Sequence, residues 1–400
     1  MTRPIRILEL RCADGGGGGP EKTILLGAAR SDPARFAVTV CYLRSAWDEA
    51  IEIDRRAQDL GIDFVAISQR RRLDLPAWRR VRQLVRQRQI DIVHAHDYKT
   101  DLMALLLARM ERIIPLSTAH GFTGHSRIER CLYYPADRRL LARFPLVIAV
   151  SSQLRATLIR AGARPERVRT VLNGIDHRRF RRDPTQVPEL RQALGLSPGE
   201  IALGVVGRVE PQKRIDILLR SLALLLPSRP NLRLFVVGEG SLRRELQQLA
   251  RELGVAHACR FLGHRGDLDR IYPALDVLVQ SSDYEGTPNV VLEAMAFETP
   301  IVATDVGGTA ELIHNDVHGS VVPPGDPNAL ARAIARTLDD KRATSARVAA
   351  ARALVEQDLS FEARMRTVER VYEELMHAFH APGTRADVRE QPIETCTRLR

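Results

Sequence analysis

The sequence predicts an α/β protein with two domains, each built on a parallel, doubly wound sheet. Short apolar runs of strand length alternate with helix-length segments over residues 5–172, which is typical of parallel sheets. A polar, proline-containing segment follows at residues 177–199, and a second alternating set begins at residue 201. The length of 400 residues fits two or three domains at about 150 residues each.

The first alternating set begins with a strand at residues 5–10, the glycines Gly15 to Gly19, and a helix that opens at Pro20 and Glu21. Glycine lets a backbone approach an anion closely, and a helix N-terminus offers free N–H groups. This arrangement therefore predicts a phosphate-binding loop, although it matches neither the dinucleotide fingerprint nor the P-loop. A flexible surface turn remains the alternative. Further strands are expected at residues 36–42, 64–67, 90–96, 115–119, 146–150 and 168–172.

The most informative stretch runs from Ser281 to Glu311 and contains Glu285 and Glu293. Between them, Thr287 and Pro288 are residue types that favour the cap and the first position of a helix. We expect a helix from Pro288, with its first N–H groups at Asn289 and Val290 forming an anion site. A loop carboxylate, a helix carboxylate and a positive helix end suit a ligand with sugar, phosphate and ribose parts.

With EGTP, LEAMA, PIVATDVGG and Glu311 in register, this stretch resembles the signature of family 4 glycosyltransferases. These are retaining enzymes of the GT-B fold. Their sequence pattern is two glutamates separated by seven residues. The resemblance implies two facing Rossmann-like domains with a cleft between them. It places Glu285 beside the donor sugar and Glu293 on the ribose hydroxyls of the nucleotide. The donor-binding residues that we expect here also include Gly286, Thr287, Asn289 and Val290.

Two cations follow the strand at residues 201–207. Arg208 and Lys213 match the GR-x4-K pattern of the family. A departing nucleoside diphosphate carries two or more negative charges, which fixed cations stabilise without a metal. Because these two cations can stabilise the diphosphate on their own, we expect no metal and no cofactor. The family also places the loop at Gly263 and His264 beside the nucleotide base.

The resemblance also selects residues in the first domain. Alignment on Glu21 makes Gly18 and Gly19 the pair that faces the donor diphosphate. His120 follows the strand at 115–119 in an HG pair, which the family places beside the donor sugar and the acceptor. His120 is therefore a candidate catalytic residue together with Glu285, Arg208 and Lys213, whereas His96 is interpreted as structural.

The domain boundaries follow from these assignments. We expect an acceptor-binding domain at 1–176, a linker at 177–199 and a nucleotide-sugar-binding domain at 200–356. A helix at 357–380 is expected to cross back to the first domain, and residues 381–400 to form a disordered tail.

Composition limits the other classes of protein. The five cysteines are scattered without CxxC spacing, and the N-terminus has no secretory signal pattern, which favours a reducing cytoplasm. No apolar run reaches the roughly 20 residues that span a bilayer. The formal charge of +11 comes mostly from arginine, and zinc-finger spacing and basic heptads are absent, so we expect no nucleic-acid partner. A basic helix over residues 78–88 predicts peripheral contact with an anionic inner membrane.

These observations predict a retaining, metal-independent hexosyltransferase. Its partners would be a nucleotide-sugar donor and a glycan or lipid-linked acceptor in cell-envelope polysaccharide or glycolipid synthesis. A nucleotide-sugar epimerase of the same fold and a non-catalytic nucleotide-sugar-binding protein remain open alternatives. The donor, the acceptor and the oligomeric state are not defined by the sequence.

Overall fold

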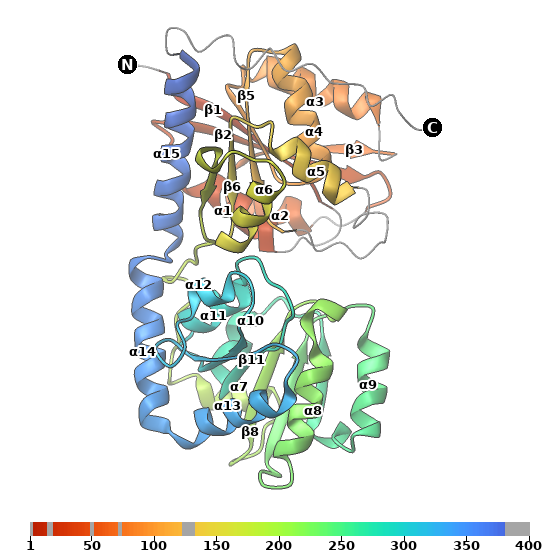
Figure 1. The fold of residues 1–400 in the computed structure, drawn as a ribbon, viewed down its shortest axis with the longest axis vertical. Helices are drawn as coiled ribbons and strands as arrows, with labels where there is room; N and C mark the ends of the chain where they lie inside the picture. Colours follow the sequence, from red (N-terminus) through yellow and green to blue (C-terminus); the bar gives the residue numbers. More distant parts are fainter. Residues whose placement is uncertain (1–2, 14–18, 49–51, 71–73, 122–132, 381–400) are drawn as a thin grey trace. The chain divides into compact units, whose positions relative to one another are not determined.

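The computed structural model describes residues 3–13, 19–48, 52–70, 74–121 and 133–380 (Figure 1). The chain forms two compact units. The first unit comprises Met1–Ala149, Arg155–Val171 and Met365–Arg400, and the second comprises Val150–Leu154 and Leu172–Arg364. Each unit contains one parallel sheet, so the prediction of two Rossmann-like α/β domains is confirmed.

The first unit has a seven-stranded sheet in the order β3-β2-β1-β4-β5-β6-β7. Neighbouring strands pair in parallel throughout. The chain first builds outward from β1 to β3 and then returns to the other side of β1, which creates a switch point between β1 and β4. The strands are β1 (Ile5–Cys12), β2 (Phe36–Ser45), β3 (Asp63–Gln69), β4 (Ile92–Ala95), β5 (Ile114–Ala119), β6 (Leu146–Ala149) and β7 (Val168–Thr170).

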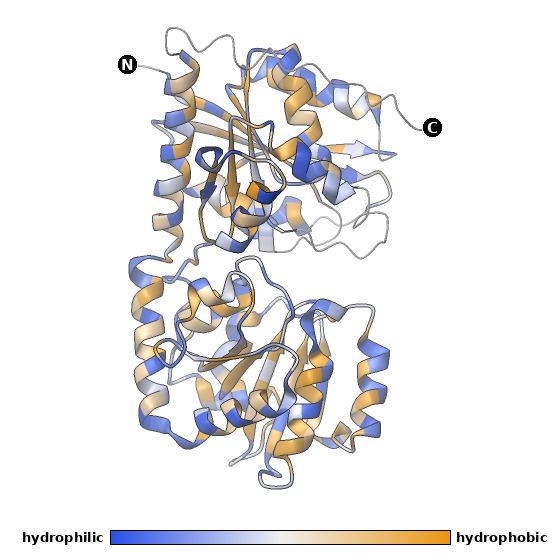
Figure 2. Cartoon of the chain, viewed as in Figure 1, coloured by the Kyte–Doolittle hydropathy of each residue, from blue (hydrophilic) through white to orange (hydrophobic). Residues whose placement is uncertain are grey.

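Helices cover this sheet because their apolar sides match the buried strands (Figure 2). The last helix contributes to the same core, where Val371 and Tyr372 pack with Ile7 and Ile92. That contact places the C-terminal part of the helix in the first unit. The helices are α1 (Gly19–Arg30), α2 (Glu52–Asp59), α3 (Leu75–Gln87), α4 (Tyr98–Met110), α5 (Tyr134–Leu141), α6 (Ser152–Arg160) and α15 (Phe361–His380), with a 3-10 turn η2 (Pro165–Arg167).

An aspartate caps two helices of the first unit, and α3 therefore begins at Leu75, earlier than the predicted residue 78. Asp74 accepts a hydrogen bond from the N–H of Ala77 at the start of α3. Asp97 accepts from the N–H groups of Lys99 and Thr100 and forms a capping box with Thr100. The residues after Asp97 therefore lie in the first turn of α4.

Two buried carboxyl groups face each other between α4 and α5. Asp101 is 2% exposed and Asp137 is 5% exposed, and their side chains are hydrogen bonded. Burial and the neighbouring Asp137 raise the pKa of Asp101 well above its usual value. Burial also raises the pKa of Asp137 to about 7. The folded pair therefore holds a proton that the unfolded chain releases.

Replacement of Asp101 by asparagine is expected to flatten the pH dependence of stability. Because both folded-state pKa values lie above the unfolded ones, the pair stabilises the fold below about pH 4 and this contribution is lost as the pH rises toward 7. An amide keeps the hydrogen bond without titrating. Thermal unfolding from pH 5 to 8 measures the effect. Each kcal/mol of unfolding free energy is expected to shift Tm by about 2–4 °C. Equal slopes in the wild type and in Asp101→Asn would contradict the shared-proton interpretation.

The second unit has a six-stranded parallel sheet in the order β10-β9-β8-β11-β12-β13. This order again reverses direction beside the first strand of the unit, so its switch point lies between β8 and β11. The strands are β8 (Ile201–Val206), β9 (Leu232–Val237), β10 (Cys259–Gly263), β11 (Val277–Gln280), β12 (Ile301–Thr304) and β13 (Ser320–Val322).

Apolar residues of this unit form two clusters, one on each face of the sheet. Leu218, Leu222 and Ile334 belong to one cluster, and Leu292 and Met295 belong to the other. The helices are α7 (Val187–Ala193), α8 (Ile215–Leu225), α9 (Arg243–Glu252), α10 (Leu268–Ile271), α11 (Asn289–Ala296), α12 (Thr309–Leu312), α13 (Pro327–Asp339) and α14 (Lys341–Gln357), and the 3-10 turns are η3 (Pro211–Lys213), η4 (Ala256–Ala258) and η5 (Tyr272–Ala274).

The segment expected to be a plain linker contains structure of its own. Helix α7 lies within residues 177–199, and Arg191 on this helix donates to Asp276 and to the carbonyl of Ala274. These contacts belong to the second unit. The tail expected at residues 381–400 lies outside the described residues.

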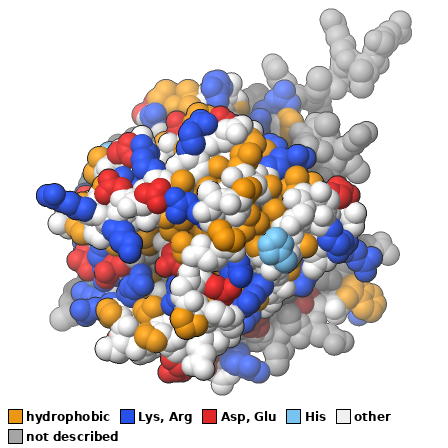
Figure 3. Space-filling view, turned by 90° about the horizontal axis from the view of Figure 1, so that it is seen from below, with side chains coloured by type: hydrophobic (Ala, Val, Ile, Leu, Met, Phe, Trp, Pro, Cys, Tyr) orange, Lys and Arg blue, Asp and Glu red, His pale blue; other side chains and the backbone are white. Residues whose placement is uncertain are grey.

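The surface in Figure 3 carries Lys and Arg side chains interspersed with acidic ones. This mixing on one face means that the net positive charge is not gathered there into a single basic patch. Among the helices that the structure describes, none combines the length and the apolar character needed to cross a bilayer.

Candidate active site

The second unit has its candidate site where β8 and β11 end, at the switch point of its sheet. The turn after β8 contains Arg208 and Lys213, and the loop after β11 contains Ser281 to Glu285. Backbone and side-chain hydrogen bonds hold the two segments together. The N–H of Asp283 donates to the carbonyl of Gln212 at 2.9 Å, and Ser281 Oγ donates to the carbonyl of Lys213 at 2.8 Å. Ligands of open α/β sheets bind at this position.

The structure brings together two of the predicted catalytic residues. Lys213 Nζ lies 2.6 Å from Glu285 Oε1, and the two side chains are only 15% and 8% exposed. Ser282 Oγ donates a second hydrogen bond to Glu285 at 2.6 Å. Both partners are therefore fixed in orientation. Arg208 stands exposed on the same turn as Lys213, two residues beyond the last residue of β8.

A pair of glycines lets the backbone of the next turn lie against the Glu285 loop. A Cβ atom on Gly308 would lie 1.9 Å from the carbonyl oxygen of Gly286, and one on Gly307 would lie 1.9 Å from that of Glu285. Gly307 also has a positive φ of 51°. The N–H of Gly308 donates to the carbonyl of Glu285 at 3.3 Å. Larger residues here would collide with the backbone of the carboxylate loop.

Helix α11 begins one residue later than predicted. Asn289 is its first residue and Pro288 occupies the cap position, where no side chain makes a capping hydrogen bond. The expectation that Thr287 caps this helix is therefore wrong. Its hydroxyl donates instead to the carbonyl of Val150, which anchors the loop to the segment after β6. The first N–H groups of the helix, those of Asn289 and Val290, have no acceptor within the helix itself.

Asn173 supports the start of α11 from another strand end. Its side-chain amide donates to Asn289 Oδ1 at 3.0 Å and to the carbonyl of Thr287 at 3.4 Å. Asn173 is 6% exposed. In the sequence, Asn173 and Gly174 indicate only a turn, because Asn-Gly is a common turn pair. The structure shows that Asn173 fixes the helix end.

Glu293 lies on the second turn of α11 and is 4% exposed. Its Oε2 atom accepts a hydrogen bond from the hydroxyl of Tyr272 at 2.7 Å. Burial and the adjacent Glu293 raise the pKa of Tyr272 well above its usual value, so this hydroxyl remains a donor. No sequence pattern connects Tyr272 to Glu293, because they come together only when η5 packs beside α11.

The other residues that were predicted to bind the donor lie on different segments of the chain. Gly263 ends β10 with a φ of 73°, and its carbonyl accepts from the N–H of Gly238 at 2.8 Å. His264 is exposed directly after it. In the first unit, Gly19 begins α1, and Glu21 is buried in an ion pair with Arg11 at 2.6 Å. Gly18 lies outside the described residues, as do Gly15, Gly16 and Gly17.

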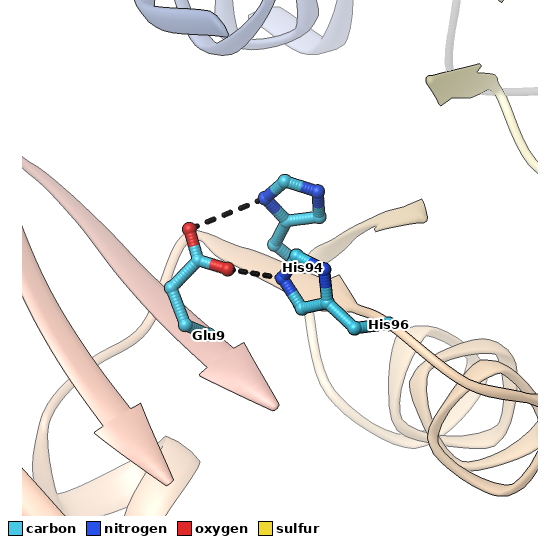
Figure 4. Close-up of side chains that lie close together, drawn as sticks. All are labelled: Glu9, His94 and His96. Atoms are coloured by element: carbon cyan, nitrogen blue, oxygen red, sulfur yellow. Dashed lines mark hydrogen bonds and ion pairs between the residues drawn. The ribbon is translucent and has the colours of Figure 1, made fainter. Parts of the chain in front are cut away.

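His120 belongs to the first unit, where it follows β5. Its Nε2 atom lies 3.1 Å from Nδ1 of His96. Behind His96, a carboxylate and a second histidine form a buried cluster of Glu9, His94 and His96, whose ligand-type atoms all lie within 4.8 Å of one another (Figure 4). The sequence analysis interpreted His96 as structural and did not consider Glu9 or His94.

Comparison with solved structures identifies the class of fold to which the two sheets belong. The crystal structure of Anabaena HepE in complex with UDP and glucose is 23% identical, with a TM-score of 0.80 over 92% of this chain and 100% of that one. Sucrose-phosphate synthase from Thermosynechococcus elongatus is 22% identical, with a TM-score of 0.80 over 94% of this chain and 100% of that one. These likenesses identify the architecture as the GT-B class.

Two family models match the chain. The model described as Glycosyltransferase Family 4 matches residues 17–179, and the model described as Glycosyl transferases group 1 matches residues 186–354. The putative glycosyltransferase EpsD of Bacillus subtilis is 34% identical over 272 residues, which is 65% of this chain and 71% of that protein. The lipopolysaccharide core biosynthesis mannosyltransferase LpsB of Rhizobium meliloti is 34% identical over 244 residues, which is 59% of this chain and 68% of that protein. The chain belongs to this family of group 1 and family 4 glycosyltransferases.

Proposed function

We propose that the protein is a retaining glycosyltransferase that moves a hexosyl group from a nucleotide-sugar donor to an acceptor hydroxyl. The observation that carries the proposal is the joining of two loops at the switch point of the second sheet. One loop bears Arg208 and Lys213, and the other bears Glu285 and leads into the N-terminus of α11. This site offers cations, helix N–H groups and a carboxylate to a single ligand.

In the proposed reaction, the bond between the anomeric carbon and the phosphate oxygen breaks while the acceptor oxygen bonds to that carbon on the same face. The acceptor proton passes to the departing phosphate oxygen. Arg208, Lys213 and the first turn of α11 stabilise the negative charge that develops on the diphosphate. We propose that these groups replace a metal ion, so that transfer proceeds in the presence of EDTA.

The other residues orient the donor. Glu285 lies beside the sugar and the positive charge that develops on it, and Glu293 accepts hydrogen bonds from the ribose hydroxyls. The turn at Gly263 and His264 contacts the base. His120 of the first unit acts at the sugar, and Gly18 and Gly19 face the diphosphate. These roles follow the family resemblance.

The names of similar proteins support the class of donor and acceptor. Solved structures of Anabaena HepE contain UDP or UDP-glucose, and LpsB of Rhizobium meliloti is named as a lipopolysaccharide core mannosyltransferase. We propose a nucleotide-sugar donor and a glycan or lipid-linked acceptor, in the synthesis of cell-envelope polysaccharide or glycolipid on the cytoplasmic side of the membrane.

A thermal-shift screen with UDP-, GDP- and ADP-sugars tests the donor proposal. A specific donor at 100 times its Kd is expected to add about 2.7 kcal/mol of stability, which raises Tm by several degrees. The donor selected in this way is then incubated with cell-envelope glycan and lipid fractions in EDTA, and NMR of the product gives the anomeric configuration. An inverted product would contradict the mechanism, free sugar without an acceptor would indicate an epimerase, and binding without turnover would indicate a non-catalytic protein.

Peripheral membrane contact is proposed for α3, which presents exposed Arg79 and Arg80. The same helix has fewer unpaired cations than its sequence suggested, because Arg82 and Arg86 both donate to Glu111. Replacement of Arg79 and Arg80 by glutamine is expected to weaken binding to vesicles with anionic lipid, by roughly 1 kcal/mol for each charge. Equal sedimentation of both proteins with these vesicles would refute the contact.

A further inference from the structure

A chain of hydrogen bonds runs from a buried carboxylate to His120 in the first unit. Glu9 on β1 is the register partner of His94 on β4, and His96 comes two residues later, so both histidines point to the same face of the sheet. Figure 4 shows the two rings side by side, with Glu9 contacting both. Glu9, His94 and His96 are 8%, 1% and 5% exposed.

The charge state of the cluster determines where its protons lie. Burial opposes ionisation of Glu9, but His94 and His96 outweigh that effect and hold the pKa of Glu9 well below its usual value. Burial and the adjacent His94 lower the pKa of His96 to about 4. At neutral pH, Glu9 is therefore a carboxylate, which only accepts hydrogen bonds, and His96 is a neutral ring with one N–H group.

These states fix the tautomers along the chain. Nε2 of His96 lies 2.5 Å from Glu9 Oε2, so the proton of His96 is on Nε2 and its Nδ1 atom is an acceptor. That Nδ1 atom faces Nε2 of His120 at 3.1 Å, with the ring planes 29° apart. His120 must therefore donate from Nε2. In the neutral ring, the lone pair of His120 is then on Nδ1.

The other oxygen of Glu9 is held by a separate branch. The hydroxyl of Tyr372 on α15 donates to Glu9 Oε1 at 2.8 Å and lies 2.9 Å from His94 Nδ1. The second nitrogen of His94 lies 2.7 Å from the hydroxyl of Thr118. The hydrogen bonds of this branch join Glu9 to Tyr372 and His94 to Thr118, and the branch supplies a control for the first one.

A shared metal ion does not fit the distances of this cluster. Two ligand atoms at about 2.1 Å from a tetrahedral zinc lie roughly 3.4 Å apart. Glu9 Oε2 and His96 Nε2 lie 2.5 Å apart, which is closer than two ligands of one zinc ion. The nitrogens of His94 and His96 are each engaged with Glu9, His120, Tyr372 or Thr118.

We propose that Glu9 and His96 are positioning residues that hold His120 with its proton on Nε2 and its lone pair on Nδ1. The functional consequence rests on the proposed function: the tautomer determines which nitrogen of His120 donates and which accepts at the proposed sugar site. Histidine tautomers that are set by a second hydrogen bond behind the ring are a general device of active sites. The proposal assigns that role to a carboxylate on the neighbouring strand β1.

The tautomer is tested without any substrate. Long-range ¹H–¹⁵N NMR of protein labelled with ¹⁵N-histidine at pH 7.5 is expected to show His120 as the Nε2–H tautomer, with its signals assigned from the variant His120→Gln. In Glu9→Gln, the amide can donate or accept, so His96 and His120 are expected to populate both tautomers. The control Tyr372→Phe breaks only the other branch and is expected to keep the wild-type tautomer. A proton on Nδ1 of His120 in the wild type, or an unchanged tautomer in Glu9→Gln, would overturn the proposal.

Kinetics with the donor found by thermal shift provide the second measurement. Glu9→Gln is expected to lower kcat by about 10-fold with little change in KM, whereas Tyr372→Phe is expected to change kcat less than 3-fold. Equal losses in both variants would show a merely structural role for Glu9. If no donor is turned over, the proposed function fails. The NMR result still decides whether Glu9 and His96 set the tautomer of His120.

Discussion

Replacement of Lys213 by alanine is expected to lower kcat for glycosyl transfer by about 10²- to 10³-fold, the loss found when one stabilising group for a developing anion is removed. Lys213 is fixed 2.6 Å from Glu285 and is 15% exposed, so its ammonium group is already oriented before the diphosphate departs. The measurement is steady-state kinetics with the donor selected by thermal shift. Because the charge forms mainly in the transition state, kcat is expected to change more than KM.

A control variant distinguishes the effect of the Lys213 charge at the site from the effect of losing one positive charge anywhere in the unit. Arg220 is an exposed cation on α8, and Arg220→Ala removes the same formal charge from the same unit. Its kcat is expected to stay within about 2-fold of the wild type, because exposed charges are screened by salt. Lys213→Ala also leaves the nearly buried Glu285 without its cation, so Tm is measured for both variants. Similar kcat losses in the two variants would contradict the assignment of Lys213 to the leaving group.

The second large effect is expected at Glu293. Glu293→Ala removes the carboxyl group that is proposed to accept from the ribose hydroxyls, and hydrogen bonds to charged groups contribute about 1.5–3 kcal/mol each. The donor Kd is therefore expected to rise by about 10- to 100-fold, measured by calorimetric titration with the nucleoside diphosphate alone. A change of this size with the diphosphate alone would place the effect on the nucleotide and not on the sugar.

Tyr272→Phe is the matched control for Glu293. It removes the 2.7 Å hydrogen bond that orients the carboxylate but keeps the carboxylate itself. Its effect on the donor Kd is expected to be several-fold smaller than that of Glu293→Ala. If Glu293→Ala leaves nucleotide affinity unchanged while both variants lose stability, Glu293 is a structural partner of Tyr272 and the ribose assignment is refuted.

Much of the fold could be predicted from hydrophobic patterning. The strands of both sheets are short apolar runs, and the polar segment at 177–199 marks the change from one alternating set to the next. The start of α3 was missed because the hydrophobic pattern contains no information about which aspartate accepts the first N–H groups. Helix α14 was not predicted, because its sequence is rich in alanine and arginine and its apolar side is narrow.

The candidate site was predictable only where it is local in sequence. Glu285, Gly286 and the start of α11 lie within a few residues of one another, and the Arg208–Lys213 turn has its own spacing. The contacts that orient these residues come from distant segments: Tyr272 for Glu293, Asn173 for Asn289, and Glu9 with His96 for His120. Such partners are chosen by strand order and packing, which sequence spacing does not encode.

The most direct test of the donor site is a crystal structure of the protein with the nucleoside diphosphate that gives the largest thermal shift. We expect the diphosphate within hydrogen-bonding distance of Arg208, Lys213 and the first N–H groups of α11, and the ribose hydroxyls on Glu293. A nucleotide bound away from the carboxyl ends of β8 and β11, with the Lys213–Glu285 pair untouched, would contradict the account.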